Sequence, residues 1–371
     1  MTSPTGQLLM VGVPGTELDA ETAAVLRRLQ PGAFILFGRN IQTPTQLRRL
    51  IDDLRDLSEV EPIITIDQEG GRVSRLKLIG SEPPNAQQLR DRGDRSLIQR
   101  HGEITAEVLR LFGFNLDLCP VLDISFDDEA DNSLRGRCYG KTATQVIDFA
   151  GAFNDSLRAG GILSCGKHFP GYSCAGEDPH HDFPSVDRPR AEMEAHELAV
   201  FRHFARTEAG SPRIDSLMIG HIHYPDLDPV RRPASLSPKL LDELLVREMG
   251  FRGLIMTDDL DMGAILNFCG FDEAIEQSVR AGNHLAMLCH RVHLAEQAGK
   301  VLAALPAAVT APALEAVARF KTKLAPPTPF SEERFREIDA RIYDLRVATL
   351  GEEAAARRSP EDGKRSPVEL Y

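Results

Sequence analysis

The sequence predicts an α/β fold, a TIM (β/α)8-type barrel built as a single domain with a C-terminal helical extension. Short apolar runs rich in Val, Ile and Leu alternate with amphipathic helical stretches, which is typical of buried parallel strands. About eight such runs occur, and eight is the strand number of this barrel. The first run continues as VGVPGTELD and lacks the GxGxxG fingerprint of an open nucleotide-binding sheet. The runs are LLMVGV, AFILF, PIITID, LDLCPVLD, ILSCGKH, SLMIGH, GLIMTD and HLAMLC.

Two helices between these runs carry their own start and stop signals. Thr43 and Pro44 are expected to start the first, because a capping hydroxyl and a proline suit the first helical turn. Ser237 and Pro238 are expected to start the second, KLLDELLVREM, which Gly250 ends. The first helix has apolar residues at helical spacing, which predicts one buried face. These residues are Leu47, Leu50, Ile51 and Leu54.

The chain is long for one domain, but a barrel of this kind routinely takes about 250 residues or more. We expect the barrel to occupy residues 1–325. From residue 326 the pattern changes to a charged helix and then to the polar tail SPEDGKRSPVELY. Residues 326–371 are therefore predicted to be a helical extension that ends in a disordered tail.

Charge and composition limit the partners of the chain. A formal charge of −12 disfavours nucleic acid or an anionic membrane, because either would select a basic patch. A neutral or modestly charged small molecule fits better, and we expect a monomer. The first residues, MTSPTGQLLMVGVPG, lack a basic start and a long apolar stretch, so we expect a cytoplasmic protein. The six cysteines form no CxxC pair and are expected to be reduced, mostly buried thiols.

Polar residues end several of the apolar runs. In a TIM barrel the active site lies at the carboxyl ends of the strands, so these residues are expected to converge on one rim. They are Asp67, Asp123, Lys167, His168, His221, His223, Asp258 and Asp259.

Asp258 follows the run GLIMT directly. A carboxylate held at the end of a buried strand has little freedom, as a nucleophile that attacks a sugar anomeric carbon requires. The alternative is that Asp258 caps the next helix, since Asp is a common N-cap. We expect Asp258 to face the site and either Asp259 or Asp261 to provide the cap.

The segment KHFPGYSCAGEDPHHDFP follows the fifth run and is rich in Gly, Pro and His. Asp178 next to His180 is the usual arrangement that orients an imidazole for proton transfer. A metal site is the alternative, with ligands drawn from His168, His180–Asp182, His221 and His223. We expect no metal or other cofactor, because no third anchored ligand is evident, and we expect His221 and His223 to be hydrogen-bonded wall residues.

Arg75 lies eight residues after Asp67, across the glycine pair at 70–71. The glycines allow the backbone to fold back, so Arg75 is expected to form a bidentate clamp beside Asp67 rather than a solvated surface charge.

Together these residues resemble glycoside hydrolase family 3, and within it the single-domain bacterial β-N-acetylglucosaminidases of cell-wall recycling. The resemblance covers about Gly6 to Gly282 and depends on many blocks in the family's order rather than on one motif. The blocks are GQLLMVGVPG, GAFILFGRNI, IDQEGGRVSRL, LDLCPVLDIS, KHFPG, DPHHDFP and ASLSPKLLDELLVREMGFRGLIMTDDLDMGAI.

The resemblance implies a retaining β-N-acetylhexosaminidase with a covalent glycosyl-enzyme. Asp258 would be the nucleophile, His180 the acid/base and Asp178 its partner. The substrates implied are muropeptide fragments that carry N-acetylglucosamine on 1,6-anhydro-N-acetylmuramic acid. The residues implied to bind the sugar are Asp67, Arg75, Arg137, Lys167, His168 and Met262.

Four departures from the family pattern keep alternatives open. Residues 172–175 read Tyr-Ser-Cys-Ala where the family usually has His-Gly-Asp-Thr, and Pro179 replaces a common serine. Cys138 and Tyr139 replace Ser-Phe, and His284 replaces a frequent aspartate. The alternatives are a β-glycoside phosphorylase of the same family and a sugar-binding protein with weak turnover.

Overall fold

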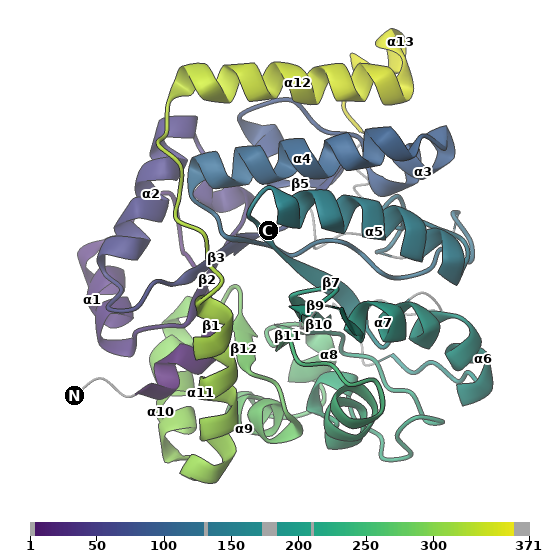
Figure 1. Cartoon of the computed structure of the whole chain (residues 1–371). Helices are drawn as coiled ribbons and strands as arrows, with labels where there is room; N and C mark the ends of the chain where they lie inside the picture. The colour runs from purple at the N-terminus through teal and green to yellow at the C-terminus, as the bar shows by residue number, and fades with distance from the viewer. Residues whose placement is uncertain (1–3, 130–132, 173–183, 209–210, 360–371) are drawn as a thin grey trace.

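The computed structural model describes residues 4–129, 133–172, 184–208 and 211–359. Its centre is a closed barrel of parallel strands in the order β1-β12-β11-β10-β7-β6-β3-β2 (Figure 1). Each of the apolar runs overlaps one barrel strand, so the predicted fold class is confirmed. The barrel strands are β1 (Leu9–Gly12), β2 (Ala33–Leu36), β3 (Ile63–Ile66), β6 (Leu116–Asp117), β7 (Leu163–Phe169), β10 (Ser216–Ile219), β11 (Leu254–Asp259) and β12 (Leu285–Leu288).

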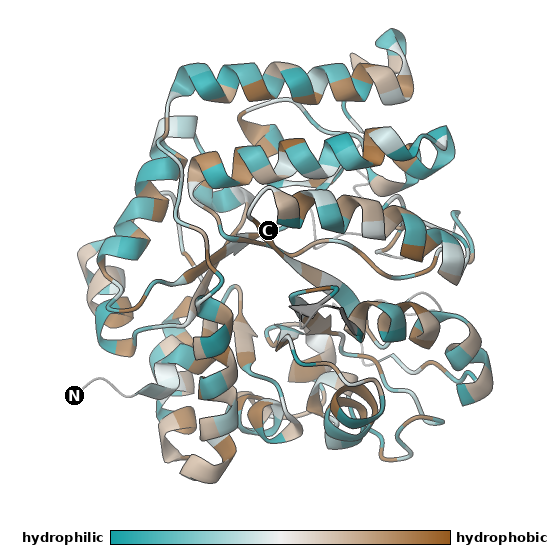
Figure 2. Ribbon diagram, viewed as in Figure 1, coloured by the Kyte–Doolittle hydropathy of each residue, from teal (hydrophilic) through white to brown (hydrophobic). Residues whose placement is uncertain are grey.

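Helices surround the barrel and alternate with its strands along the chain (Figure 1). Figure 2 shows both hydrophilic and hydrophobic residues along α2, α4 and α12, as expected for helices with one apolar face. The helices are α1 (Ala20–Leu29), α2 (Pro44–Asp56), α3 (Ala86–Arg92), α4 (Arg95–Phe112), α5 (Ala143–Ala159), α6 (Arg190–Ala195), α7 (Glu197–Ala205), η5 (Lys239–Glu248), α8 (Gly263–Leu266), α9 (Phe271–Ala281), α10 (Ala295–Ala304), α11 (Ala307–Lys321), α12 (Glu332–Leu350) and α13 (Glu352–Ala355).

Both predicted helix starts are confirmed. The Thr43 hydroxyl accepts a hydrogen bond from the Gln46 backbone N–H at 3.2 Å, and the four predicted apolar residues of α2 are buried. The Ser237 hydroxyl accepts from the Leu240 N–H at 3.1 Å at the start of η5. Gly250 follows the end of η5 with a φ of 76°, a left-handed conformation that favours glycine.

The C-terminal extension packs on the barrel's outer helices. In Figure 1, α12 lies along α4. The Ser81 N–H donates to Asp339 Oδ1 at 2.5 Å, and Arg346 Nη1 donates to Glu82 Oε1 at 2.8 Å. The predicted boundary at residue 325 stays a prediction, and residues 360–371 of the predicted tail lie outside the described residues.

A short antiparallel hairpin follows β3 and consists of β4 (Gln68–Gly70) and β5 (Val73–Ser74). Gly70 and Gly71 turn the chain with φ angles of 112° and 57°. A Cβ on Gly70 would lie 2.3 Å from the Pro84 carbonyl oxygen, so the turn requires glycine for space as well as for conformation. The predicted fold-back between Asp67 and Arg75 is confirmed.

The cysteines within the described residues are free thiols, as expected. Burial raises the pKa of the Cys119, Cys138 and Cys289 thiols well above the usual value, which keeps them protonated and unreactive. Cys174 lies outside the described residues.

Among the described helices, none is by itself long and apolar enough to cross a membrane. One bent pair, Val292–Ala304 with Ala307–Lys321, passes that test by length and composition only.

His101, on α4, is a buried imidazole. Neither ring nitrogen has a hydrogen-bond partner within the described part of the chain. The ring packs against Phe153 with 5.1 Å between centroids and lies next to Gly70 of the hairpin. Burial lowers the pKa of His101 to about 4. The folded protein therefore holds this ring in its neutral form.

We predict that His101 makes folding stability sensitive to acid. An unfolded histidine takes up a proton near pH 6.5, whereas the folded chain resists protonation of His101 until about pH 4. This contribution is complete above about pH 6.5 and is lost as the pH falls toward 4. Between about pH 7 and 5, urea denaturation should show a loss of unfolding free energy about 2 kcal/mol larger in wild type than in His101→Leu.

The matched control is His293→Leu, because His293 is exposed. It should lose stability in parallel with wild type over the same pH range. Equal pH dependence of His101→Leu and wild type would contradict the assignment.

Candidate active site

Every predicted catalytic or sugar-binding residue within the described ranges lines one pocket at the carboxyl ends of the barrel strands. This end is where TIM barrels carry their active sites. Of the other strand-end residues expected on this rim, His221 and Asp259 line the pocket, whereas Asp123 and His223 do not. The predicted acid/base His180 and its partner Asp178 lie outside the described residues. The predicted residues that line the pocket are Asp67, Arg75, Arg137, Lys167, His168, Asp258 and Met262.

A network of buried ion pairs joins four of these side chains to Glu69. Arg137 donates through Nε and Nη2 to the two Glu69 oxygens at 2.8 and 2.7 Å, a bidentate pair. Lys167 Nζ lies 2.6 Å from Glu69 Oε1 and donates to Asp67 Oδ1 at 2.6 Å. Arg75 Nη2 lies 3.5 Å from Asp67 Oδ2, so Arg75 is buried beside Asp67 as predicted, while a bidentate clamp by its guanidinium group stays a prediction.

Glu69, which joins these side chains, is a site residue that the patterns in the sequence did not predict. Burial by itself would raise the pKa of the Glu69 carboxyl, but the charges of Arg137 and Lys167 outweigh it and hold the pKa well below the usual range. Burial lowers the pKa of Lys167, and the nearby Asp67 and Glu69 raise it overall. A signal was present, because a buried arginine and lysine need an anion. Glu69 also lies two residues after Asp67, on the same side of an extended chain.

His168 is oriented by Asp123, which ends the fourth apolar run. His168 Nδ1 lies 2.8 Å from Asp123 Oδ2, and His168 lines the pocket. The other Asp123 oxygen accepts from the Tyr172 N–H at 2.7 Å. Tyr172 and Ser133 both line the pocket, and the Ser133 hydroxyl donates to the Tyr172 hydroxyl at 2.8 Å. Tyr172 thus replaces the family's usual histidine with a side chain held in the pocket wall.

Asp258 lies next to the last residue of β11 and lines the pocket, as predicted. The expected capping role of Asp259 or Asp261 is wrong. Helix α8 has Met262 at its N-cap, with no side-chain capping bond. Asp259 Oδ1 instead accepts from the Asp261 and Cys289 N–H groups at 3.0 and 3.1 Å. The reason is that the segment just beyond β12 lies beside Asp259 and Asp261 and provides backbone N–H groups to both carboxylates.

The Asp261 carboxylate also accepts hydrogen bonds from backbone N–H groups. Its Oδ2 accepts from the His290 and Arg291 N–H groups, both at 2.9 Å. Burial, with Asp261 and Asp258 nearby, raises the pKa of Asp259 to about 8, while its two backbone donors act in the opposite direction.

His221 and His223 are hydrogen-bonded, as predicted. His221 contacts Ser235 Oγ at 2.7 Å through Nδ1 and donates to the Asp259 carbonyl oxygen at 2.9 Å through Nε2. His221 lines the pocket. His223 Nδ1 lies 3.1 Å from Ser185 Oγ, and its Nε2 lies 3.2 Å from the Asp228 carbonyl oxygen. Both rings use their two nitrogens in these contacts.

Asp117 is a buried carboxyl group at the end of β6. Its Oδ1 accepts from the Gln68 N–H at 3.1 Å, whereas Oδ2 has no hydrogen-bond partner within the described residues. Burial raises the pKa of Asp117 to about 8. A carboxyl group that keeps its proton at neutral pH adds no third negative charge near Asp67 and Glu69.

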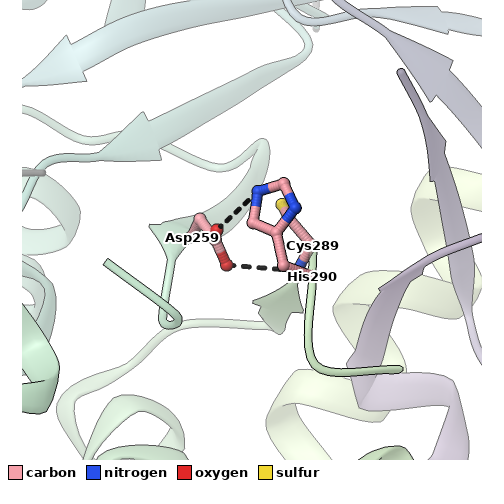
Figure 3. A group of neighbouring side chains, drawn as sticks. All are labelled: Asp259, Cys289 and His290. Atoms are coloured by element: carbon pink, nitrogen blue, oxygen red, sulfur yellow. Dashed lines mark hydrogen bonds and ion pairs between the residues drawn. The ribbon is translucent and has the colours of Figure 1, made fainter. Parts of the chain in front are cut away.

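One group within the described residues has the composition of a metal site, namely Asp259, Cys289 and His290 (Figure 3). The potential ligand atoms of the three side chains lie within 4.8 Å of one another. Arg39 Nη1, however, lies 3.0 Å from His290 Nδ1. A guanidinium group can only donate, so Nδ1 accepts and the ring proton is assigned to Nε2, which faces Asp259 Oδ2 at 3.4 Å. With both ring nitrogens used and a cation beside it, His290 is a poor metal ligand here.

Comparison with known proteins agrees with this geometry. The model of the glycosyl hydrolase family 3 N terminal domain matches residues 2–322. A β-hexosaminidase of Tolumonas auensis is 34% identical over 284 residues, 76% of this chain and 82% of that protein. A β-hexosaminidase of Vibrio cholerae serotype O1 is 33% identical over 332 residues, 89% of this chain and 94% of that protein.

Solved structures of a β-N-acetylglucosaminidase and of NagZ are also similar to this chain. A family 3 β-N-acetylglucosaminidase from Paenibacillus sp. has a TM-score of 0.80 and 30% identity, covering 93% of this chain and 68% of that one. NagZ from Neisseria gonorrhoeae has a TM-score of 0.77 and 28% identity, covering 91% and 97%. The matching family model and the β-hexosaminidase relatives show that the chain is a glycoside hydrolase. The chain belongs to glycoside hydrolase family 3, so the resemblance in the sequence is confirmed.

We predict that Glu69 is essential for the pocket's stability. Glu69→Gln would leave Arg137 and Lys167 buried without their shared anion, and removing one partner of a buried ion pair costs about 3–5 kcal/mol. Urea denaturation should show a loss of that order, together with a fall in kcat/KM on any substrate that wild type cleaves.

Glu61→Gln is the matched control, because Glu61 pairs with Arg55 at an exposed position. It should cost at most about 1 kcal/mol. Similar losses in the two variants would contradict a central role for Glu69.

Proposed function

We propose that the chain is a retaining β-N-acetylglucosaminidase that removes terminal non-reducing N-acetylglucosamine from muropeptide-type glycosides. One observation carries the proposal. Asp258, a carboxylate at the end of β11, shares its pocket with the Asp67, Lys167 and Arg137 network. The similarity to β-hexosaminidases and to a β-N-acetylglucosaminidase supports the choice of sugar.

The proposed binding of the sugar follows from hydrogen-bonding capacity. Asp67 can accept from sugar hydroxyls, while Arg75, Lys167 and His168 can donate to them. Hydrogen bonds that involve a charged group are stronger than hydrogen bonds between two neutral groups. Met262, which is nearly buried in the pocket wall, supplies an apolar surface.

The proposed reaction is a double displacement that uses only side chains of this protein. Asp258 attacks the anomeric carbon and forms a glycosyl ester, while the bond to the leaving oxygen breaks and His180 transfers a proton to that oxygen. His180, for which we propose Asp178 as the partner, then removes a proton from water, which attacks the anomeric carbon and releases Asp258. The sugar leaves with its original β configuration.

The first experiment compares aryl N-acetyl-β-glucosaminide with aryl β-glucoside in a buffer without phosphate and with EDTA present. We expect release of the phenol from the first substrate at a kcat/KM at least about tenfold higher than from the second, because one lost polar contact costs about 1.4 kcal/mol or more. Binding of N-acetylglucosamine without turnover would contradict the proposal. So would activity that requires phosphate and yields sugar 1-phosphate.

The second prediction separates Asp258 from His180, because they act on different atoms. Asp258→Ala should be nearly inactive on every substrate, since bond formation at carbon always needs the carboxylate. His180→Ala should lose most activity on a disaccharide but still release dinitrophenol in a burst, because that leaving group needs no proton. Azide should then speed the slow second step and yield the β-glycosyl azide.

Asp261→Asn is a matched control for Asp258→Ala. Asp261 lines the same pocket, but its Oδ2 accepts hydrogen bonds from backbone N–H groups. It should retain measurable turnover. Equal losses of His180→Ala on dinitrophenyl and disaccharide substrates, with no burst, would assign the acid/base role elsewhere.

A further inference from the structure

His290 lies just beyond β12 and connects two parts of the pocket rim. Its ring is in contact with Arg39, which follows β2, and with Asp259, the last residue of β11. The same ring packs against Phe37 with 5.3 Å between centroids. Figure 3 shows the His290 ring directed toward Asp259. Four neighbouring strand ends of the barrel, those of β2, β1, β12 and β11, therefore meet near this imidazole.

Arg39 is held firmly enough to fix the ring. Its Nε donates to the Val13 carbonyl oxygen at 3.0 Å and its Nη2 to the Cys289 carbonyl oxygen at 2.5 Å. The third donor, Nη1, faces His290 Nδ1 at 3.0 Å. Because Nδ1 must accept, the neutral ring carries its proton on Nε2, toward Asp259.

Asp259 in turn holds the strand end that carries Asp258. One Asp259 oxygen binds the backbone of Cys289 and Asp261, which ties β11 to β12 and to the following turn. The Asp259 N–H donates to Asp258 Oδ1 at 2.8 Å. The second Asp259 oxygen faces His290 Nε2. A shift of the Asp259 side chain would therefore move the backbone N–H that contacts Asp258.

We propose that His290 is a positioning residue for Asp258, acting through Asp259, with its ring tautomer fixed by Arg39. The inference rests on the proposed function, in which Asp258 is the nucleophile. Misplacing a nucleophile by about 1 Å can cost about 100-fold in rate, so a contact one residue away is enough to matter. His290 does not need to touch the reacting atoms for this role.

The test compares His290→Leu with His290→Gln on aryl N-acetyl-β-glucosaminide. His290→Leu removes the donor, so kcat and kcat/KM should both fall by about 10- to 100-fold while KM changes by less than about twofold. His290→Gln keeps a neutral N–H donor and has no tautomer to fix, so it should stay within about threefold of wild type. Arg39→Gln should lower kcat in the wild-type background but not further in His290→Gln.

His293→Leu, at an exposed position three residues on, is the control and should match wild type. A wild-type kcat in His290→Leu, or equal losses in the Leu and Gln variants, would overturn the positioning role. If the losses of kcat in Arg39→Gln and His290→Gln simply add in the double variant, Arg39 does not act through the His290 ring. That result would overturn the part assigned to Arg39. If Asp258→Ala stays active, the proposed function fails; if it is inactive while His290→Leu is normal, only the inference fails.

Discussion

The pocket depends on the pairing of buried cations with Glu69. Arg137 and Lys167 are almost fully buried, and two such charges are tolerated only with an anion in hydrogen-bonding contact. Glu69 provides that anion to both. Lys167 also holds Asp67, and Asp67 lies beside Arg75, so the groups proposed to bind sugar hydroxyls are ordered before any ligand arrives. The glycine turn at 70–71 allows this, because it returns the chain from Asp67 to Arg75.

A second set of contacts orders the opposite part of the rim. The carboxylates that follow Asp258 bind backbone N–H groups beyond β12 instead of capping a helix. The Phe37 ring lies between the sets, with the Arg39 guanidinium 4.6 Å and that of Arg75 5.8 Å from its centroid. The network proposed to bind the sugar and the contacts around Asp259 therefore pack against one aromatic side chain, so that the geometry of each limits the other.

Local signals in the sequence predicted the barrel strands, the caps at Thr43 and Ser237 and the gathering of strand-end residues. These features depend on periodicity and on neighbours along the chain. Glu69 was missed because its meaning comes from Arg137, a partner 68 positions later. The caps expected from Asp259 or Asp261 were wrong for a similar reason, since the donors that these residues bind lie about 30 positions on. Patterns among neighbouring residues cannot show which backbone N–H groups from a distant part of the sequence will lie next to a carboxylate.

The proposed mechanism requires a covalent bond between Asp258 and the sugar. The most direct measurement is mass spectrometry of the protein after incubation with a 5-fluoro N-acetylglucosaminyl fluoride, which reacts quickly but is hydrolysed slowly from the enzyme. The account predicts one sugar per chain, located by peptide mapping at Asp258 and absent in Asp258→Ala. A label on Asp259, Asp261 or another side chain, or turnover of the reagent by an inverting route without any adduct, would contradict it.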